Sequence, residues 1–158
     1  MTVSPFTFWS VMLNTRSPIK GFFGEYRWLS NFAPCSIVYD GIEYPSIENA
    51  YVAAKTVDVN ARIELQSCTS GQAKRIGRTF QLRSQWEQLK VPLMRQFLIQ
   101  KFTQEPYRSL LIETQGRYLE ETNTWNDRFW GVCGTGQNML GSLIMDIRDS
   151  LTEENSGV

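Results

Sequence analysis

The chain of 158 residues contains no histidine. Histidine is the usual proton carrier near neutral pH, and it is the base of Ser-His and Cys-His nucleophile pairs. Its absence excludes those pairs, every histidine metal site and any imidazole proton shuttle. If the chain is an enzyme, carboxylates, lysines or tyrosines must move the protons.

Cysteine is scarce as well. The three cysteines, Cys35, Cys68 and Cys133, are an odd number, widely spaced and without a Cys-x-x-Cys pair. This argues against a disulfide framework and against a zinc site. The acidic residues are scattered and offer no cluster of oxygen ligands for a hard cation. We therefore expect no metal and no cofactor.

Long hydrophobic runs are also missing. No run of about twenty apolar residues occurs, as a membrane-spanning helix would need. The stretch through Ile19 lacks the basic start and the small-residue cleavage pattern of a secretory signal. No linker or internal repeat divides the chain, and its length favours one domain. We expect a soluble, cytoplasmic protein that consists of a single domain.

The charge is balanced overall but unevenly distributed. Sixteen Lys and Arg match sixteen Asp and Glu. Between Lys74 and Arg108, however, eight basic residues stand against two acidic ones, a surplus of six, whereas acidic residues dominate from Glu113 onward. The basic segment could meet phosphate groups, or it could present ordinary solvated helix faces.

Turn and capping signals predict the first regular elements. Asp40-Gly41 favours a tight turn, so residues 36–39 and 42–44 should form a β-hairpin. Ser46 is a suitable N-cap for a helix that ends at about Lys55, because apolar residues follow it with helical spacing.

Apolar periodicity predicts the remaining elements. We expect helices from Ser70 through Arg78, over the stripe that begins at Trp86, after Pro106, and over residues 140–151, with a short strand around Leu119. Residues 122–138 should form a loop. The sum is a helix-rich α+β domain with a small antiparallel β-sheet.

Glu48 and Lys55 are the first pair with chemical potential. They are seven residues apart, which brings them within roughly 20° of each other on the helix, at the edge of its apolar stripe. Such groups would be partly desolvated, and desolvation shifts the pKa of a titratable group. The alternative is a boundary pair whose charged ends reach water.

Two aromatic segments without clear periodicity are further candidates. Residues 125–131 hold two tryptophans and a phenylalanine around Asp127, and residues 22–32 end in Ser30, Asn31 and Phe32. Large aromatic side chains in loops need a surface to pack on, either the core or a planar ligand.

The separated motifs of the chain, taken together, resemble the NADAR family, also called YbiA-like. The resemblance runs in unbroken order from about Phe22 to Leu151. The motifs that carry it are Leu29-Ser30-Asn31-Phe32, Tyr44-Pro45-Ser46-Ile47-Glu48-Asn49-Ala50-Tyr51 with Ala54-Lys55, Ala73-Lys74-Arg75-Ile76-Gly77-Arg78, Trp86, Lys101-Phe102, Asn126-Asp127 with Trp130-Gly131, and Gly136, Asn138, Leu140-Gly141 and Met145.

The resemblance implies a YbiA-like fold and N-glycosidase activity, the hydrolysis of a bond between ribose and nitrogen. It implies as substrate either a ribosylamino-pyrimidine intermediate of riboflavin synthesis or an ADP-ribosylated guanine, the latter free or in DNA. It divides the chain into an N-terminal extension (1–20) and the NADAR domain (21–152), and the residues of the last segment (153–158) by themselves predict a flexible tail. It does not decide between the substrates, and the oligomeric state stays open.

The resemblance also assigns site residues by position. Catalytic roles fall to Glu48, Asp127 and Lys55, and which carboxylate is the base stays open. Asn49 stands where many members of the family have histidine. The residues expected to bind substrate are Asn31, Phe32, Lys74, Arg78, Trp86, Trp125, Trp130 and Asn138.

Two other functions compete with the enzyme. The same pocket could belong to a sensor that binds ADP-ribose or a related nucleotide without cleaving it. Alternatively, the exposed aromatic side chains could dock a protein partner. Retention of Glu48, Lys55 and Asp127 favours the enzyme, because a pure binding module has no need for both carboxylates.

Overall fold

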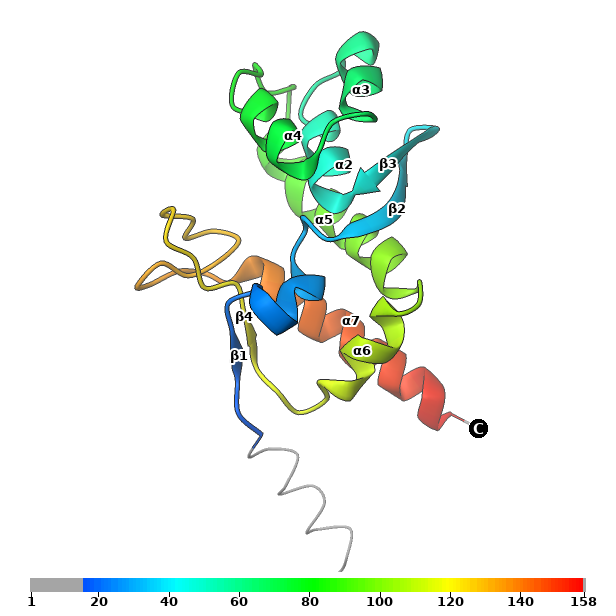
Figure 1. Ribbon diagram of the computed structural model, residues 1–158, viewed down its shortest axis with the longest axis vertical. Coiled ribbons are helices and arrows are strands. Elements are labelled where there is room, and N and C mark those ends of the chain that lie inside the picture. Colours follow the sequence, from blue (N-terminus) through cyan, green and yellow to red (C-terminus); the bar gives the residue numbers. More distant parts are fainter. Residues whose placement is uncertain (1–15, 158) are drawn as a thin grey trace, which may run out of the picture. The chain divides into compact units, whose positions relative to one another are not determined.

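The computed structural model describes residues 16–157, so most of the expected N-terminal extension lies outside the described residues. These residues divide into two compact units: a central unit, Arg27–Glu105, and a terminal unit that joins the chain before Arg27 to the chain from Pro106 onward. Figure 1 shows the elements in chain order: β1 (Ile19–Lys20), η1 (Gly24–Leu29), β2 (Pro34–Tyr39), β3 (Ile42–Ser46), α2 (Ile47–Ala54), α3 (Val59–Leu65), α4 (Ser70–Gly77), α5 (Trp86–Phe102), α6 (Tyr107–Glu113), β4 (Leu119–Glu120) and α7 (Met139–Ser156).

The predicted hairpin is confirmed. β2 and β3 pair antiparallel, with Tyr39 opposite Ile42. Asp40 and Gly41 both have positive φ, 49° and 79°. Two such residues form the turn whose twist matches that of the two strands.

Helix α2 is the centre of the central unit. The Ser46 hydroxyl accepts the Asn49 backbone N–H (3.1 Å), which confirms the predicted N-cap, and the helix ends before Lys55. The hairpin and helices α3, α4 and α5 all pack against α2. Every residue of α2 except Glu48 is buried, so this helix is held rigidly on all other sides.

Helices α4 and α5 cover α2. Helix α4 begins at Ser70, as predicted. Its N-cap is the preceding residue, Thr69, which forms a reciprocal pair of hydrogen bonds with Gln72. Helix α5 runs without interruption past Pro92, and it buries Met94, Phe97 and Phe102 among others. The favourable burial of this face offsets the backbone hydrogen bond that proline cannot make.

Helix α3 was not predicted. The Asp58 carboxylate accepts the backbone N–H groups of Asn60 and Ala61, and so begins the helix. Val59 and Ile63 are more than half exposed, whereas Arg62 is buried. Hydrophobic periodicity is therefore absent from this segment, and only local capping marks it.

The terminal unit contains a sheet that differs from the prediction. β1 and β4 pair in parallel, Ile19 with Leu119, whereas only an antiparallel sheet was expected. Helix α7 packs against β4 and α6. It continues to Ser156, so residues 153–156 are helical rather than the expected flexible tail, and the Ser156 hydroxyl bonds the Thr152 carbonyl inside this last turn.

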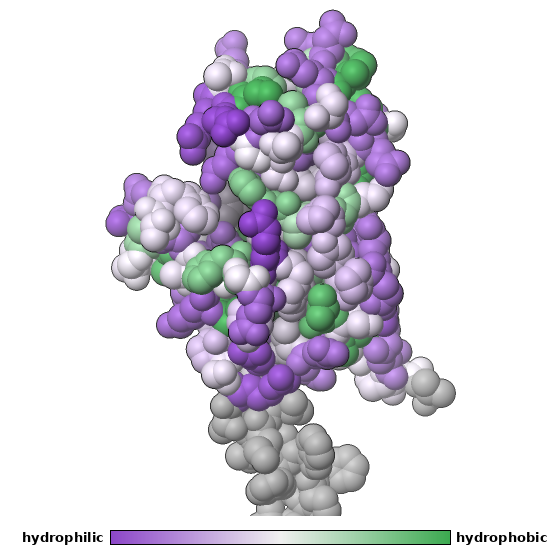
Figure 2. Space-filling model, in the orientation of Figure 1, coloured by the Kyte–Doolittle hydropathy of each residue, from purple (hydrophilic) through white to green (hydrophobic). Residues whose placement is uncertain are grey.

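The surface shows no separation of the two hydropathy classes on the face drawn in Figure 2, where hydrophilic and hydrophobic residues are interspersed. Among residues 16–157, no helix combines the length and the apolar character that crossing a membrane requires.

Candidate active site

Glu48 lies in the first turn of α2, and Lys55 follows directly after the last. Both side chains are half-buried. Burial lowers the pKa of Lys55, the Glu48 carboxylate opposes this shift, and the Lys74 ammonium adds to it. These three charged groups therefore interact at one face of the central unit.

Aromatic rings surround the charged groups. The Lys55 ammonium lies 5.1 Å from the centroid of the Tyr51 ring, and the Lys74 ammonium lies 5.6 Å from that of Phe32. The Trp86 ring packs on Tyr51 at 5.2 Å and is 5% exposed. Such cation–π contacts are attractive and hold the lysines in place. Tyr51 was expected as a core residue and was not proposed for the site.

The loop before β2 is tied down at three successive carbonyl groups. Lys101 Nζ donates to Ser30 O (2.8 Å), Glu48 N donates to Asn31 O (3.1 Å), and Ser70 Oγ donates to Phe32 O (3.1 Å). Three helices, α5, α2 and α4, thus hold one loop. This arrangement fixes Asn31 and Phe32 beside the first turn of α2.

Asn31 keeps an unused acceptor at this place. Its Oδ1 atom is buried and has no hydrogen-bond partner within residues 16–157, while its Nδ2 group contacts Met94 Sδ at 3.6 Å. A buried amide oxygen without a donor is unfavourable in a folded protein. A ligand hydroxyl or amine would satisfy it, which supports the predicted binding role of Asn31.

Lys101 corrects one inference from the charge distribution. It was counted in the basic segment that could meet phosphates, but its side chain is completely buried. Burial lowers the pKa of Lys101 to about 8, although the nearby Cys35 thiol favours the charged form. The buried ammonium group of Lys101 binds the Ser30 carbonyl, so Lys101 holds the loop in place from inside the protein and is not exposed to a phosphate ligand.

Asn49 has a structural role in the first turn of α2. Its Oδ1 atom accepts the Ser46 hydroxyl (2.6 Å), and its Nδ2 group donates to Leu65 O (2.9 Å) and Cys68 O (2.8 Å). The side chain is fully buried. It therefore connects α2 to the end of α3 and to the segment that follows.

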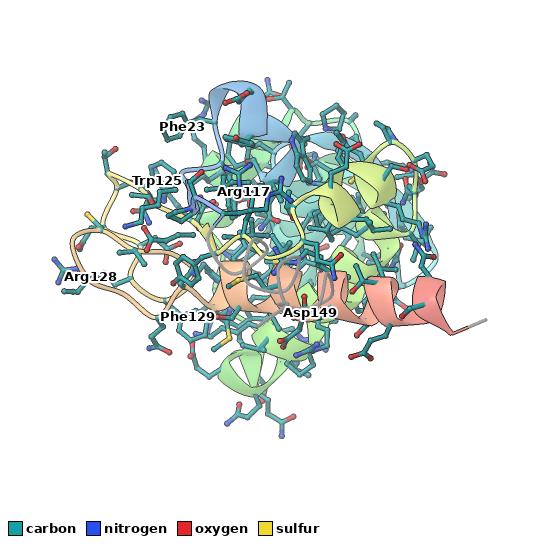
Figure 3. The ribbon with its side chains drawn as sticks, turned by 90° about the horizontal axis from the view of Figure 1, so that it is seen from below. Phe23, Arg117, Trp125, Arg128, Phe129 and Asp149 are labelled. Atoms are coloured by element: carbon teal, nitrogen blue, oxygen red, sulfur yellow. The ribbon has the colours of Figure 1, made fainter. Side chains whose placement is uncertain are left out.

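The second group of predicted residues lies in the terminal unit, on the loop that leads into α7 (Figure 3). Asp127 Oδ1 accepts the backbone N–H groups of Phe129 (3.1 Å) and Trp130 (2.9 Å). Asn123 braces the same turn, because its side chain binds both the N–H and the C=O of Asp127. One carboxylate oxygen of Asp127 thus organises its own loop.

The aromatic residues of this loop differ in exposure. Trp125 is 54% exposed, whereas Trp130 is half-buried and meets Phe129 edge to face at 4.9 Å. Arg128 points away from the loop in Figure 3. The loop therefore displays one tryptophan, Trp125, and packs the other.

Asn138 is buried and fully engaged. Its Oδ1 atom accepts Glu121 N, and its Nδ2 group donates to Leu119 O and to the Tyr118 hydroxyl. These bonds favour a structural role over the predicted contact with substrate. Arg78, also expected to bind substrate, is exposed at the end of α4.

Within the described residues, no three His, Cys, Asp or Glu side chains are grouped so that they could hold a metal ion. The central unit instead gathers a carboxylate, two lysines and three aromatic rings around one buried helix. Charged groups next to aromatic rings are typical of a site that binds a polar ligand with a ring. The protein is thus a small, helix-rich α+β domain with a candidate site of this kind. The chain belongs to the NADAR domain family, whose pattern matches residues 19–152.

Individual relatives agree with this assignment. The chain is 38% identical over 136 residues to N-glycosidase YbiA of Escherichia coli (strain K12), covering 82% of this chain and 84% of that protein. It is 36% identical over 135 residues to a riboflavin biosynthesis protein of Vibrio vulnificus (strain YJ016), covering 82% and 36%. The NMR structure of E. coli YbiA matches with a TM-score of 0.79 and 33% identity, over 90% of this chain and 89% of that chain. The likeness thus extends to fold as well as sequence, as expected for an α+β domain of the YbiA type.

Proposed function

We propose that this chain is an N-glycosidase that hydrolyses the C–N bond between a ribose and a nucleobase or base precursor. The observation that carries the proposal is the pairing of Glu48 with Lys55 on one face of α2, where the charges of both side chains interact. The relatives named N-glycosidase support the reaction class.

The chemistry of the bond explains why these groups suit it. As the C–N bond breaks, its electron pair leaves with the base, and the ribose ring acquires oxocarbenium character. A carboxylate next to the anomeric carbon stabilises this charge, and it can take a proton from the water that attacks the same carbon. The departing nitrogen gains a proton from solvent, so that water is added across the C–N bond. We assign this role to Glu48, because it is half-buried and held by the tied loop.

Lys55 has a supporting role in this proposal. Its ammonium group interacts with Glu48 and lies over Tyr51. A cation there attracts the carboxylate, and it can donate to a ribose hydroxyl. Asn31 Oδ1 is available to a donor on the same ligand.

The ligand is proposed to carry phosphate as well as a ring. Lys74 is half-buried next to Phe32, and Arg78 follows directly after the end of α4. A ring stacked on Phe32 would contribute about 1 to 3 kcal/mol. The burial of Trp86 favours support of Tyr51 over direct stacking.

Two phosphate-bearing substrates fit this description. One is a ribosylamino-pyrimidine phosphate, and the other is ADP-ribosylated guanine, free or in DNA. The name of the Vibrio vulnificus relative favours the first. Both should be assayed, and the released ribose phosphate or ADP-ribose quantified by mass spectrometry.

The decisive variant is Glu48→Gln, which keeps the shape of the side chain and removes its charge. We expect the turnover rate to fall about 100-fold or more, the range of general acid–base catalysis. Glu64→Gln is the matched control, since Glu64 is an exposed glutamate of the same unit. Wild-type turnover in the Glu48 variant would remove this residue from the mechanism.

Asp127 requires a pair of variants because its carboxylate also orders the loop. Asp127→Asn keeps an oxygen that can accept the N–H groups of Phe129 and Trp130, whereas Asp127→Ala loses it. If charge matters for catalysis, both variants lose activity. If only loop geometry matters, Asp127→Asn retains it, and the predicted catalytic role is wrong.

The sensor remains the competing function, and the same samples test it. Tight calorimetric binding of ADP-ribose, together with no product from either substrate, would replace the enzyme with the binding module.

A further inference from the structure

A depression lies in the central unit, lined by residues of β2, the hairpin turn, α3 and the segments that flank it. Its volume is about 540 Å³, within the range of small-molecule sites. Its lining includes Tyr39, Arg62, Arg83 and three valines, Val38, Val57 and Val59. It also includes Asp40, whose carboxylate pairs with Arg62. None of these residues takes part in the proposed glycosidase site.

Two arginines converge on the Tyr39 hydroxyl. Arg62 Nη2 donates to this oxygen at 3.3 Å and Arg83 Nη1 at 3.0 Å. A phenol oxygen has two lone pairs, so both are used. The O–H of Tyr39 must therefore point away from the arginines, and no acceptor within residues 16–157 receives it.

The two arginines differ in their remaining partners. Arg62 is buried, bonds the carbonyls of Ala53 and Thr56, and pairs with Asp40 at 2.7 Å. It is thus fully used by the fold. Arg83 is half-buried, and its backbone N–H is fixed to Lys55 O (2.8 Å). Within residues 16–157 its guanidinium donates a hydrogen bond to Tyr39. In the described part of the chain, no carboxylate neutralises Arg83.

The rim of the depression is apolar. Val38, Val57 and Val59 are 50%, 67% and 61% exposed. The depression therefore has two chemically different parts. One is the apolar surface of the exposed valines, and the other is polar and consists of the Arg83 guanidinium and the O–H of Tyr39. Such a site matches a ligand with an anionic end and an apolar body.

We propose that this depression binds a small molecule with an anionic oxygen group, a phosphate or a carboxylate. The guanidinium of Arg83 and the O–H of Tyr39 donate to the anionic oxygens, and the apolar part of the ligand covers the valines. Arg62 holds Tyr39 in position from behind through its bond and its stacking on the ring, 4.9 Å from the centroid.

The test follows the arginine side chains of the full ¹⁵N-labelled protein by NMR. Inorganic phosphate and acetate are added separately at constant ionic strength, as probes of the two anion types. We expect saturable shifts of the Arg83 Nε–Hε signal and of the Tyr39 amide signal. The probe that saturates at the lower concentration identifies the anion.

Variants assign the effect to the site. Arg83→Gln should weaken binding about tenfold or more, since it removes a charged donor, and Tyr39→Phe should weaken it about fivefold. Arg75→Gln, an exposed arginine on α4, is the control and should bind as the wild type does.

Shifts that rise linearly and equally for all exposed arginines would overturn the proposal, as would unchanged binding in Arg83→Gln. If Tyr39→Phe fails to fold, Arg83→Lys takes its place. It keeps the charge and loses the fork of donors, so intermediate binding is expected. Because the readout is binding, the result is independent of any glycosidase activity.

Discussion

Replacing Lys101 by methionine tests the energetic cost of a completely buried ammonium group. Lys101 donates to Ser30 O at 2.8 Å, and its ammonium lies 5.2 Å from the centre of the Phe102 ring. Burial nevertheless lowers the pKa of Lys101 from 10.5 to about 8. Methionine has a similar length, so the substitution removes the charge with little change in packing.

The sign of the effect follows from proton uptake. Between pH 8 and 10.5 the folded protein has released the proton of Lys101, whereas the unfolded chain still holds it. Stability rises with pH wherever the unfolded state binds more protons. The difference of 2.5 pKa units, at 1.36 kcal/mol each, amounts to about 3 kcal/mol. Below pH 8 both states are protonated, and the contribution of Lys101 no longer depends on pH.

The assay is urea unfolding of the wild-type and Lys101→Met proteins between pH 7 and pH 10.5. Burial raises the pKa of Cys35 and of Tyr44, so the stability these groups contribute is lost as pH rises through the same range. Tyr44 cancels in the comparison. Cys35 interacts with Lys101, so both proteins carry Cys35→Ala. Because Cys35 raises the pKa of Lys101, its removal does not reduce the expected effect.

We expect the free energy of unfolding of the protein with Lys101 to rise by about 3 kcal/mol relative to the methionine variant as pH increases. Differences in packing and in the hydrogen bond to Ser30 shift the free energy of unfolding by an amount that does not vary with pH. A difference that stays constant over this range, or that falls, would refute the assigned cost of burial.

Two further predictions concern stability. Asn49→Ala leaves one buried and one partly buried carbonyl group without their donor, so we expect a loss of about 2 to 4 kcal/mol in urea unfolding; a loss below about 1 kcal/mol would contradict the bridging role. Gly141→Ala would press a methyl group against Leu119 O at the start of α7, and should lower the melting temperature by several degrees. Gly71→Ala is its control, because a methyl group there meets nothing within 4 Å; it should leave the protein unchanged or slightly more stable.

Local signals explain which elements could be predicted from sequence. Asp40-Gly41 determines its turn through backbone conformation alone, and Ser46 determines the start of α2 through one side-chain bond. These signals act over a few residues, so no knowledge of the fold is needed. The same holds for the apolar stripes of α5 and α7.

Elements without a local signal were missed. β1 has two residues and exists only because it pairs with β4, a hundred residues away in sequence. Helix α3 points Val59 and Ile63 toward solvent and buries Arg62, the reverse of the usual pattern. Burial of Arg62 is possible only because carbonyl groups and Asp40 surround it, and these come from other segments.

The candidate site divides in the same way. Helical spacing predicted that Glu48 and Lys55 share one half-buried face, and the helix confirms it. The roles of Asn49 and Asn138 were not predictable, because their hydrogen-bond partners are backbone carbonyl and N–H groups that no sequence pattern marks.

By itself, the sequence determined the chemistry that is available: a chain without histidine must use carboxylates and lysines, and Glu48 and Lys55 are in place by the geometry of a single helix. Only the tertiary structure decided which charged side chains can contact a ligand and which are buried. Lys101 and Arg62 are enclosed by the fold, whereas Arg83 is left without a counter-ion in the described residues. The physical reason is that burial and pairing depend on groups brought together from distant segments, while helix and turn geometry depend on neighbours in the chain.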